Sequence, residues 1–395
     1  MDKLKLERNL RICQLMEVFY AGICLMIPSI VGYWTAHGMK FQDIALLQSC
    51  FAIGVVVLEV PSGYFADCFG RKRSMVIASC LLAIGDVVYA TSSGFYGFLL
   101  AELLLAASFA FCSGADVAMA RSSLRALGRE SEFDKFVANL HCLAFISMAV
   151  AGTLGGFLAS INPTLPFWGE ALLGMFAIIS TLHLVEPEGA IESNRKMSLR
   201  EVLQMAKRSF AVDFNIAWLI LFSALLSSWI RISVWLYQPY FEKSGLSLTE
   251  IGFAFSALNL MAAVGSRYLG RHLAGGSVSW VKLLLVTAAA YISMSFCMGL
   301  AYAWTLPLFH QVIRGAMGVG FASMLRKRVA EQDFATVGSM QSFSSSLVYA
   351  CVLPLFCASI DCSGAEFSLL LAGIIGLSVC MLAYCYKPAE SIEVQ

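Results

Sequence analysis

Long apolar runs alternate with short polar separators along the whole chain. Most runs are about 20 residues long, which one α-helix needs to cross the ~30 Å hydrocarbon core of a bilayer. Uninterrupted runs of this length predict membrane-spanning helices rather than strands. We therefore expect an all-α membrane protein with twelve transmembrane helices. Their approximate ranges are 12–35, 43–65, 74–92, 97–124, 136–160, 167–185, 214–240, 249–270, 280–302, 305–327, 335–360 and 365–386.

Composition supports a lipid environment. Hydrophobic residues make up 59% of the 395 residues and charged residues only 13%, whereas soluble domains carry roughly 25% charge. The net charge of +1 argues against nucleic-acid binding, which needs a clustered basic excess. No metal-ligand cluster or cofactor motif is expected.

The separators divide the chain into two halves. The longest connection contains the charged stretch Glu192 to Lys196, so we expect bundles at 1–190 and 214–395 joined by a cytoplasmic loop at 191–213. An offset of 207 residues aligns Gly38 with Gly245 and Gly63 with Gly270, at matching places in the second and eighth spans. Such a weak repeat is typical of transporters built from two parallel repeats. Two six-helix bundles are therefore predicted.

The distribution of Lys and Arg predicts the orientation. Twenty of the 27 basic residues lie in loops on the N-terminal side of the membrane, and only Lys40 and Lys243 lie on the other side. The positive-inside rule then predicts that both termini are cytoplasmic. We expect the protein to span the plasma (inner) membrane. The first apolar run has no A-x-A cleavage site, so we expect a retained span rather than a signal peptide. We expect a monomer in the lipid bilayer.

The loop after the second span carries the most specific motif. Gly63-Tyr64-Phe65-Ala66-Asp67-Cys68-Phe69-Gly70-Arg71-Lys72-Arg73 resembles the G-x-x-x-D-x-x-G-R-[KR] signature of the major facilitator superfamily (MFS). The resemblance covers the whole chain and implies the MFS fold, secondary transport by alternating access and no enzymatic activity. It also implies that Gly63, Asp67, Gly70, Arg71 and Lys72 form a cytoplasmic latch that holds the two bundles together in the outward-open state.

One departure from the family pattern bears on the substrate. Drug/proton antiporters of the family carry G-P-x-x-G-G in the fifth span, where this chain has Ala151-Gly152-Thr153-Leu154-Gly155-Gly156. The missing proline argues against drug antiport, although Gly152 and Gly156 still offer a close-packing face.

Basic residues deep in the second half suggest an anion-binding site. Arg231 and Arg314 fall in the seventh and tenth spans, which line the central cavity in the family, and charges at such depth are costly unless they function. Guanidinium groups match carboxylates in two-bonded geometry. Polar and aromatic residues of neighbouring spans complete the predicted substrate site: Trp235, Gln238, Asn259, His310, Gln311 and Gln341.

Acidic residues within spans are concentrated in the first half. Desolvation favours the protonated form of a carboxyl group, so such an acid can bind a proton and release it when water enters. Glu17 in the first span and Asp116 in the fourth are the favoured proton-coupling residues, together with Glu59; Asp86 in the third span is interpreted as structural.

The leading hypothesis is a proton-coupled transporter, acting as a symporter, of a small organic anion such as a carboxylate or a carboxylate siderophore bearing a metal. Export of lipophilic drugs by proton antiport is the alternative. A membrane-embedded transferase is disfavoured because the chain has no H-E-x-x-H motif, no phosphate-binding loop and no soluble domain. A sensor or scaffold that does not transport is the remaining alternative.

Overall fold

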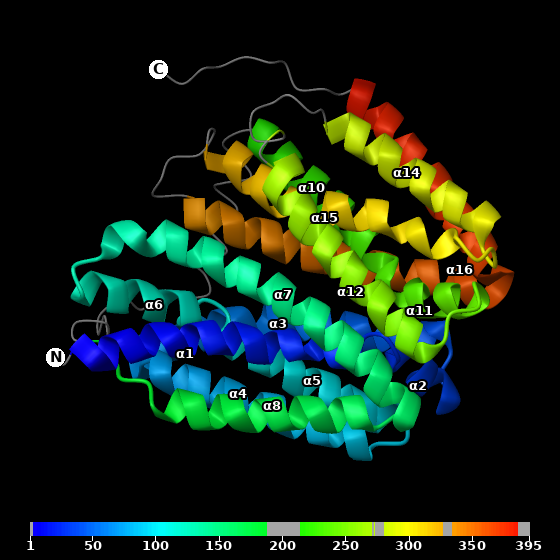
Figure 1. The fold of residues 1–395 in the computed structure, drawn as a ribbon. Coiled ribbons are helices and arrows are strands. Elements are labelled where there is room, and N and C mark those ends of the chain that lie inside the picture. Colours follow the sequence, from blue (N-terminus) through cyan, green and yellow to red (C-terminus); the bar gives the residue numbers. More distant parts are fainter. Residues whose placement is uncertain (1–2, 188–213, 271, 273–279, 327–333, 386–395) are drawn as a thin grey trace. The chain divides into compact units, whose positions relative to one another are not determined.

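A computed structural model describes residues 3–187, 214–270, 272, 280–326 and 334–385. The part of the chain that it describes contains helices and no strand. The predicted loop at 191–213 lies outside the described residues. Figure 1 shows the helices in chain order.

Each predicted span corresponds to one helix, to a broken pair, or to one half of a kinked helix. The helices of the first half are α1 (Lys3–Ala21), η1 (Gly22–Leu25), α2 (Ile30–Ala36), α3 (Phe41–Phe69), α4 (Arg71–Thr91), α5 (Phe95–Cys112), α6 (Ala115–Ala126), η2 (Glu130–Glu132), α7 (Phe133–Ile161) and α8 (Leu165–Leu182). Those of the second half are α10 (Phe214–Ile232), α11 (Val234–Lys243), α12 (Leu248–Val264), the π-helix η3 (Gly265–Leu269), α14 (Trp280–Cys297), η4 (Ala303–Thr305), α15 (Pro307–Arg326) and α16 (Phe334–Cys385).

Among these, eight helices are long and apolar enough to cross a membrane, or nine if the bent pair in the first span counts as one. α16 contains both of the last two predicted spans, which are separated by a kink at Gly364 with φ of 85°. The sequence prediction of an all-helical membrane protein is confirmed.

The first span is broken, and its sequence explains the break. The helix axis bends by 45° between Lys3–Leu25 and Ile30–Ala36. Pro28 has no backbone N–H and disfavours helical geometry at the residue before it, so a continuous helix ends here. Gly155 of α7 and Gly22 allow α7 and α8 to approach the break closely, since a Cβ on Gly155 would overlap the Leu25 carbonyl and one on Gly22 would overlap Leu173.

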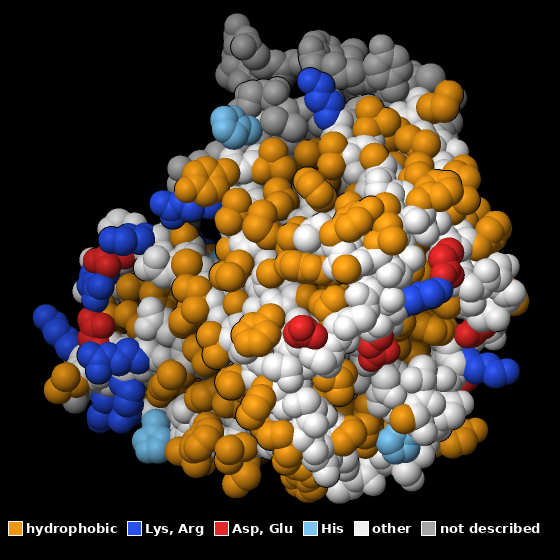
Figure 2. All heavy atoms as spheres, turned by 45° about the vertical axis from the view of Figure 1, so that its right-hand side comes forward, with side chains coloured by type: hydrophobic (Ala, Val, Ile, Leu, Met, Phe, Trp, Pro, Cys, Tyr) orange, Lys and Arg blue, Asp and Glu red, His pale blue; other side chains and the backbone are white. Residues whose placement is uncertain are grey.

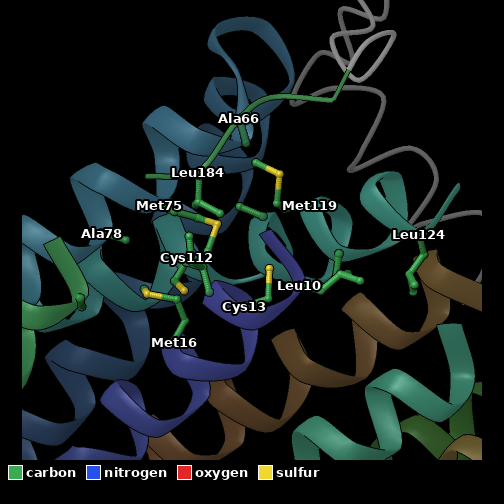
Figure 3. Close-up of a cluster of buried hydrophobic side chains, with 14 residues drawn as sticks. Leu10, Cys13, Met16, Ala66, Met75, Ala78, Cys112, Met119, Leu124 and Leu184 are labelled. Carbon is green, nitrogen blue, oxygen red and sulfur yellow. The ribbon is translucent and has the colours of Figure 1, made fainter. Parts of the chain in front are cut away.

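The residues group into two compact units. One comprises 1–39, 46–197 and 248–256, and the other comprises 40–45, 198–247 and 257–395. In the first unit, sulfur-rich side chains from α1, α4, α5 and α6 form a buried cluster that includes Cys13, Met16, Met75 and Met119 (Figure 3). Leu184, just after α8, joins this cluster and is fully buried.

Glycines permit tight packing of α7 in the first unit. Gly156 lies against Gly252 in the first turns of α12, and Gly152 lies against Ser256. The Ser256 hydroxyl donates to the Ala149 carbonyl and lies 2.7 Å from the hydroxyl of Thr153. The close-packing face predicted for Gly152 and Gly156 is thus present without the family's proline.

The surface is apolar, as expected for helices in contact with lipid tails. On the face shown in Figure 2, hydrophobic side chains cover most of the described area, and Lys and Arg gather mainly toward its edges. Individual side chains such as Val57, Phe157 and Leu355 are more than half exposed on single helices. A surface of this kind would aggregate in water and is stable in a bilayer.

Candidate functional site

Arg231, Trp235 and Tyr349 form the centre of a polar cluster in the second unit. The Arg231 guanidinium lies 4.1 Å from the centre of the Tyr349 ring. The Tyr349 hydroxyl accepts a hydrogen bond from the indole Nε1 of Trp235 at 2.6 Å. Trp235 and Tyr349 are buried, whereas Arg231 is exposed. A cation over an aromatic face is attracted to the ring by roughly 0.5–2 kcal/mol, so the ring fixes the guanidinium and leaves its edge N–H groups accessible.

Hydroxyl and amide groups join α10 to α16 beside this centre. Ser228 donates to the Ser345 carbonyl at 2.9 Å, and Ser227 and Ser345 hydroxyls lie 3.2 Å apart. Gln341 donates through Nε2 to the Ser345 hydroxyl at 3.1 Å. These bonds connect Gln341 of α16, through Ser345, to Ser227 and Ser228 of α10, the helix that carries Arg231.

Arg314 and Asn259 form a second contact in the same unit. The Arg314 Nη2 donates to the Asn259 Oδ1 at 2.9 Å, which links α15 to α12. The two helices approach closely because Gly315 lies against the Ala262 carbonyl and Gly265 lies against the Val312 carbonyl. Gly265 begins a π-helical turn, a deviation often found at functional sites.

His310, Gln311 and Gln238 are more deeply buried than Arg231. His310 is 0% exposed, with Nε2 3.2 Å from the Thr287 carbonyl, and Gln311 donates to the Tyr237 hydroxyl at 3.3 Å. Gln238 donates to Glu242 at 2.8 Å. These three side chains are therefore held by neighbours inside the bundle, whereas the Arg231 side chain is exposed.

Glu17 and Asp116 lie together in the first unit. Their charges interact, and both act on the buried thiol of Cys13, which donates to the Asp116 backbone carbonyl. Asp116 lies in the first turn of α6, two residues after the break at Gly114, whose φ is 78°. Glu59, half-buried on α3, has no described interaction with either residue. The structure thus brings two of the three predicted coupling residues together.

The motif after the second span is built around Arg71 and a residue that sequence reasoning missed. Arg71 donates to the Ala118 carbonyl at 2.9 Å and to the Ser122 hydroxyl. Glu186 accepts hydrogen bonds from the backbone N–H groups of Arg71 and Lys72 at 3.2 and 3.0 Å. A carboxylate at this position stabilises the positive end of the α4 dipole.

Gly70 permits this cap, because its φ is 102° and a Cβ would lie 3.1 Å from the Glu186 carboxylate. Gly63 is open, with nothing within 4 Å of a Cβ. Asp67 is exposed and forms no hydrogen bond or ion pair with the residues that the structure describes. The carboxylate that caps the N-terminus of α4 in this conformation is therefore Glu186 and not Asp67.

The two carboxylates separate a structural role from a conformational one. We expect Glu186→Ala to lower the free energy of unfolding by about 0.5–2 kcal/mol, because α4 loses its N-terminal cap. We expect Asp67→Asn to leave thermal stability unchanged, because Asp67 is exposed, and to slow substrate exchange if the predicted latch engages Asp67 in the outward-open state. Thermal melting in detergent and exchange rates in liposomes measure the two effects.

Glu130→Ala is the matched control for the cap, since the ion pairs of Glu130 within the described part of the chain are those with exposed Arg125 and Arg121 of α6. Exposed ion pairs contribute little to the free energy of unfolding. Normal exchange velocity in correctly inserted Asp67→Asn protein would contradict the latch.

Comparison with known proteins gives the family. The model of the Major Facilitator Superfamily matches residues 14–350. This chain belongs to the major facilitator superfamily. It is accordingly an integral, multi-pass membrane transporter of small molecules and not an enzyme.

MFS relatives include two resistance proteins. Quinolone resistance protein NorA of Staphylococcus aureus (strain MRSA252) is 23% identical over 342 residues, which cover 84% of this chain and 82% of NorA. Multidrug resistance protein 1 of Bacillus subtilis is 25% identical over 307 residues, covering 70% of this chain and 75% of that protein.

Among solved structures, the nucleoside transporter NupG aligns with a TM-score of 0.76 at 13% identity, over 98% of this chain and all of NupG. This likeness shows that the fold is the twelve-helix MFS fold.

Sequence reasoning missed further residues that organise this MFS bundle. Asn9 is fully buried and bonds both the carbonyl and the N–H of Val185, which holds the segment after α8 in place. Its position outside the predicted first span hid it, because α1 begins at Lys3 and extends well before residue 12. Glu186 was hidden likewise in a separator, although an acid directly after a span was a usable signal.

Proposed function

We propose that this chain is a proton-coupled secondary transporter of small organic carboxylates, with planar aromatic acids as preferred substrates. The observation that carries the proposal is the exposed Arg231 guanidinium held over Tyr349. Among the described residues Arg231 forms no ion pair, so an anion is its natural partner. Its free edge offers the two parallel N–H groups that bind a carboxylate.

The surroundings of Arg231 favour an aromatic acid. Trp235 and Tyr349 fix each other through a hydrogen bond, and aromatic side chains provide flat apolar contact next to a charged group. Arg314, held by Asn259, supplies a second guanidinium for the same substrate. Gln341, Gln238, His310 and Gln311 supply further polar groups in the same unit, and we include them in the proposed binding region.

Export of lipophilic drugs is the second candidate, and the names of the relatives favour it. Quinolones themselves carry an aromatic carboxylate, so the quinolone resistance of one relative is compatible with recognition through arginine. A carboxylate siderophore that carries a metal would also be recognised through its carboxylate groups, but it has fewer aromatic rings. The charge of the substrate therefore discriminates the candidates better than its size does.

Proton coupling is proposed through the first unit. Glu17 and Asp116 interact beside the break at Gly114, and two nearby carboxyl groups favour retention of a proton between them. We propose symport of the anion with protons across the plasma (inner) membrane. The distribution of basic residues supports cytoplasmic termini. Alternating access of the two bundles would expose the substrate to each side in turn.

The coupling proposal predicts a separation of two activities. In proteoliposomes, Glu17→Gln and Asp116→Asn are expected to abolish accumulation of labelled nalidixate, a planar aromatic carboxylate, under an imposed pH gradient. Both variants should retain exchange of nalidixate at equal pH, because exchange needs no net proton movement. Glu59→Gln serves as the comparison, since Glu59 lies apart from the pair.

Undiminished gradient-driven accumulation in both variants would place the coupling site elsewhere. Loss of equal-pH exchange together with accumulation would also contradict the proposal, because it would assign the two acids to substrate binding or folding.

A further inference from the structure

Asp86 of α4 and Glu170 of α8 meet at a tightly packed antiparallel helix interface. Along this interface Ser79 contacts Thr181, Ala83 contacts Gly174 and Tyr89 stacks on Phe167 with ring centres 5.3 Å apart. In an antiparallel pair the residue numbers of facing positions have a nearly constant sum, which places Asp86 opposite Glu170. The two carboxyl groups lie within hydrogen-bonding reach of each other.

Both carboxyl groups are removed from solvent. Asp86 is 1% exposed and Glu170 is 3% exposed. Neither oxygen of Asp86 receives a hydrogen bond from an N–H or O–H donor of the described residues. Glu170 Oε1 accepts one hydrogen bond, from the backbone N–H of Met26 at 2.9 Å. Asp86 and Glu170 can therefore bond to each other only if one of them carries a proton.

The titratable groups that face this pair are acidic or neutral. Tyr89 of α4 donates to Glu102 of α5 at 2.5 Å, and the charges of Asp86 and Glu170 act on its hydroxyl. Cys50 of α3 lies near Glu102. No lysine, arginine or histidine of the described chain pairs with Asp86 or Glu170. Two adjacent carboxylates away from water cannot both be ionised, because their repulsion and desolvation add.

We propose that Asp86 and Glu170 form a proton-binding site in which a proton shared by the two carboxyl groups is exchanged during the transport cycle. The site is separate from Glu17 and Asp116. The site binds a proton, and it is connected to the break in the first span through the hydrogen bond from Met26 to Glu170. Exchange of the proton during a transport cycle rests on the proposed function, whereas the existence of the proton site does not.

The bond to Met26 connects the charge of the pair to the first span. Met26 lies directly after η1, where its N–H has left the helical hydrogen-bond pattern. A hydrogen bond to a charged acceptor is stronger than one to a neutral acceptor. The singly protonated pair therefore holds the break firmly, and uptake of a second proton loosens it. Because Glu17 lies on the same span, a change at the break would move Glu17 as well.

Infrared difference spectroscopy of the purified full chain between pH 6 and pH 9 tests the site without a substrate. Exposed carboxyl groups stay ionised in this range, since their ordinary pKa lies near 4. We expect a protonated-carboxyl C=O band that changes with pH and is lost in both Asp86→Asn and Glu170→Gln. The double variant Glu17→Gln with Asp116→Asn should retain it.

Persistence of the same band in Asp86→Asn and Glu170→Gln, or a band that does not change with pH, would overturn the proposal. A band lost only in the Glu17 and Asp116 double variant would support the proposed coupling residues and refute this site. If the single variants fail to fold, ¹³C-aspartate labelling of the Glu17→Gln, Asp116→Asn protein decides. A labelled shift of the titrating band supports Asp86, and no shift refutes it.

Hydrogen exchange of the segment 22–29 tests the link to the first span. In the wild type, protection of this segment, corrected for the intrinsic pH dependence of exchange, should rise with pH as the pair loses its second proton. Glu170→Gln keeps an acceptor oxygen for Met26 but cannot titrate, so its corrected protection should be independent of pH. Identical pH profiles in the two proteins would refute the link.

Discussion

A Gly315→Ala substitution is expected to lower the apparent melting temperature by roughly 5–10 °C, whereas Gly318→Ala in the same helix should raise it slightly. A Cβ at Gly315 would overlap the backbone carbonyl of Ala262, and a backbone group in a packed helix cannot move aside as a flexible side chain can. At Gly318 nothing lies within 4 Å of a Cβ. Melting in detergent, followed by size-exclusion chromatography of heated samples, measures both.

Both variants change glycine to alanine in the same helix, so the effect of helix propensity cancels when their melting temperatures are compared. Alanine favours a helix over glycine by about 1 kcal/mol, and this gain should appear alone at Gly318. Equal melting temperatures for both variants would contradict the packing of α15 on α12. Because Arg314 precedes Gly315, and Asn259 lies one turn before Ala262, the same substitution should also disturb the Arg314–Asn259 bond.

Replacement of Arg231 by lysine is expected to raise the Kd for nalidixate roughly tenfold or more, although the charge is kept. Lysine has no planar fork for a carboxylate and stacks less well on an aromatic ring. A tenfold change corresponds to about 1.4 kcal/mol, within the contribution of one charged hydrogen bond. Quenching of the nearby Trp229 and Trp235 fluorescence during titration measures the affinity. Arg314→Gln should weaken binding by a similar factor.

Arg267→Lys is the control for Arg231→Lys, because Arg267 is exposed at the end of the eighth span and lies in the π-helical turn rather than in the aromatic cluster. Its affinity for nalidixate should match that of the wild type. Equal affinity in the wild type, Arg231→Lys and Arg314→Gln would contradict an anion site in the second unit.

The helices were predictable from sequence because each transmembrane segment must be apolar along its whole length. The interruptions within these helices were less predictable. Pro28 marks the break in the first span in hindsight, but the predicted range 12–35 passed across it. The last two spans could be distinguished in the sequence, because the separator between them contains Asp361, Cys362 and Gly364.

The pairs that form the candidate sites were beyond sequence reasoning. Arg231 and Tyr349 are far apart in sequence, and spacing on one helix says which residues share a face but not what that face meets. Asp86 was interpreted as structural because its span is usually peripheral in the family. Its contact with Glu170 and its lack of a donor depend on the facing helix, which periodicity does not reveal.

Recognition of an organic anion by this transporter is tested by exchange that is stimulated from the opposite side of the membrane. Proteoliposomes are loaded with unlabelled nalidixate or with ethidium, a planar aromatic cation, and entry of labelled nalidixate is timed at equal pH. We expect faster entry of labelled nalidixate when unlabelled nalidixate is inside, and no stimulation by internal ethidium. Stimulation by ethidium, or entry unaffected by internal nalidixate, would contradict recognition of an organic anion.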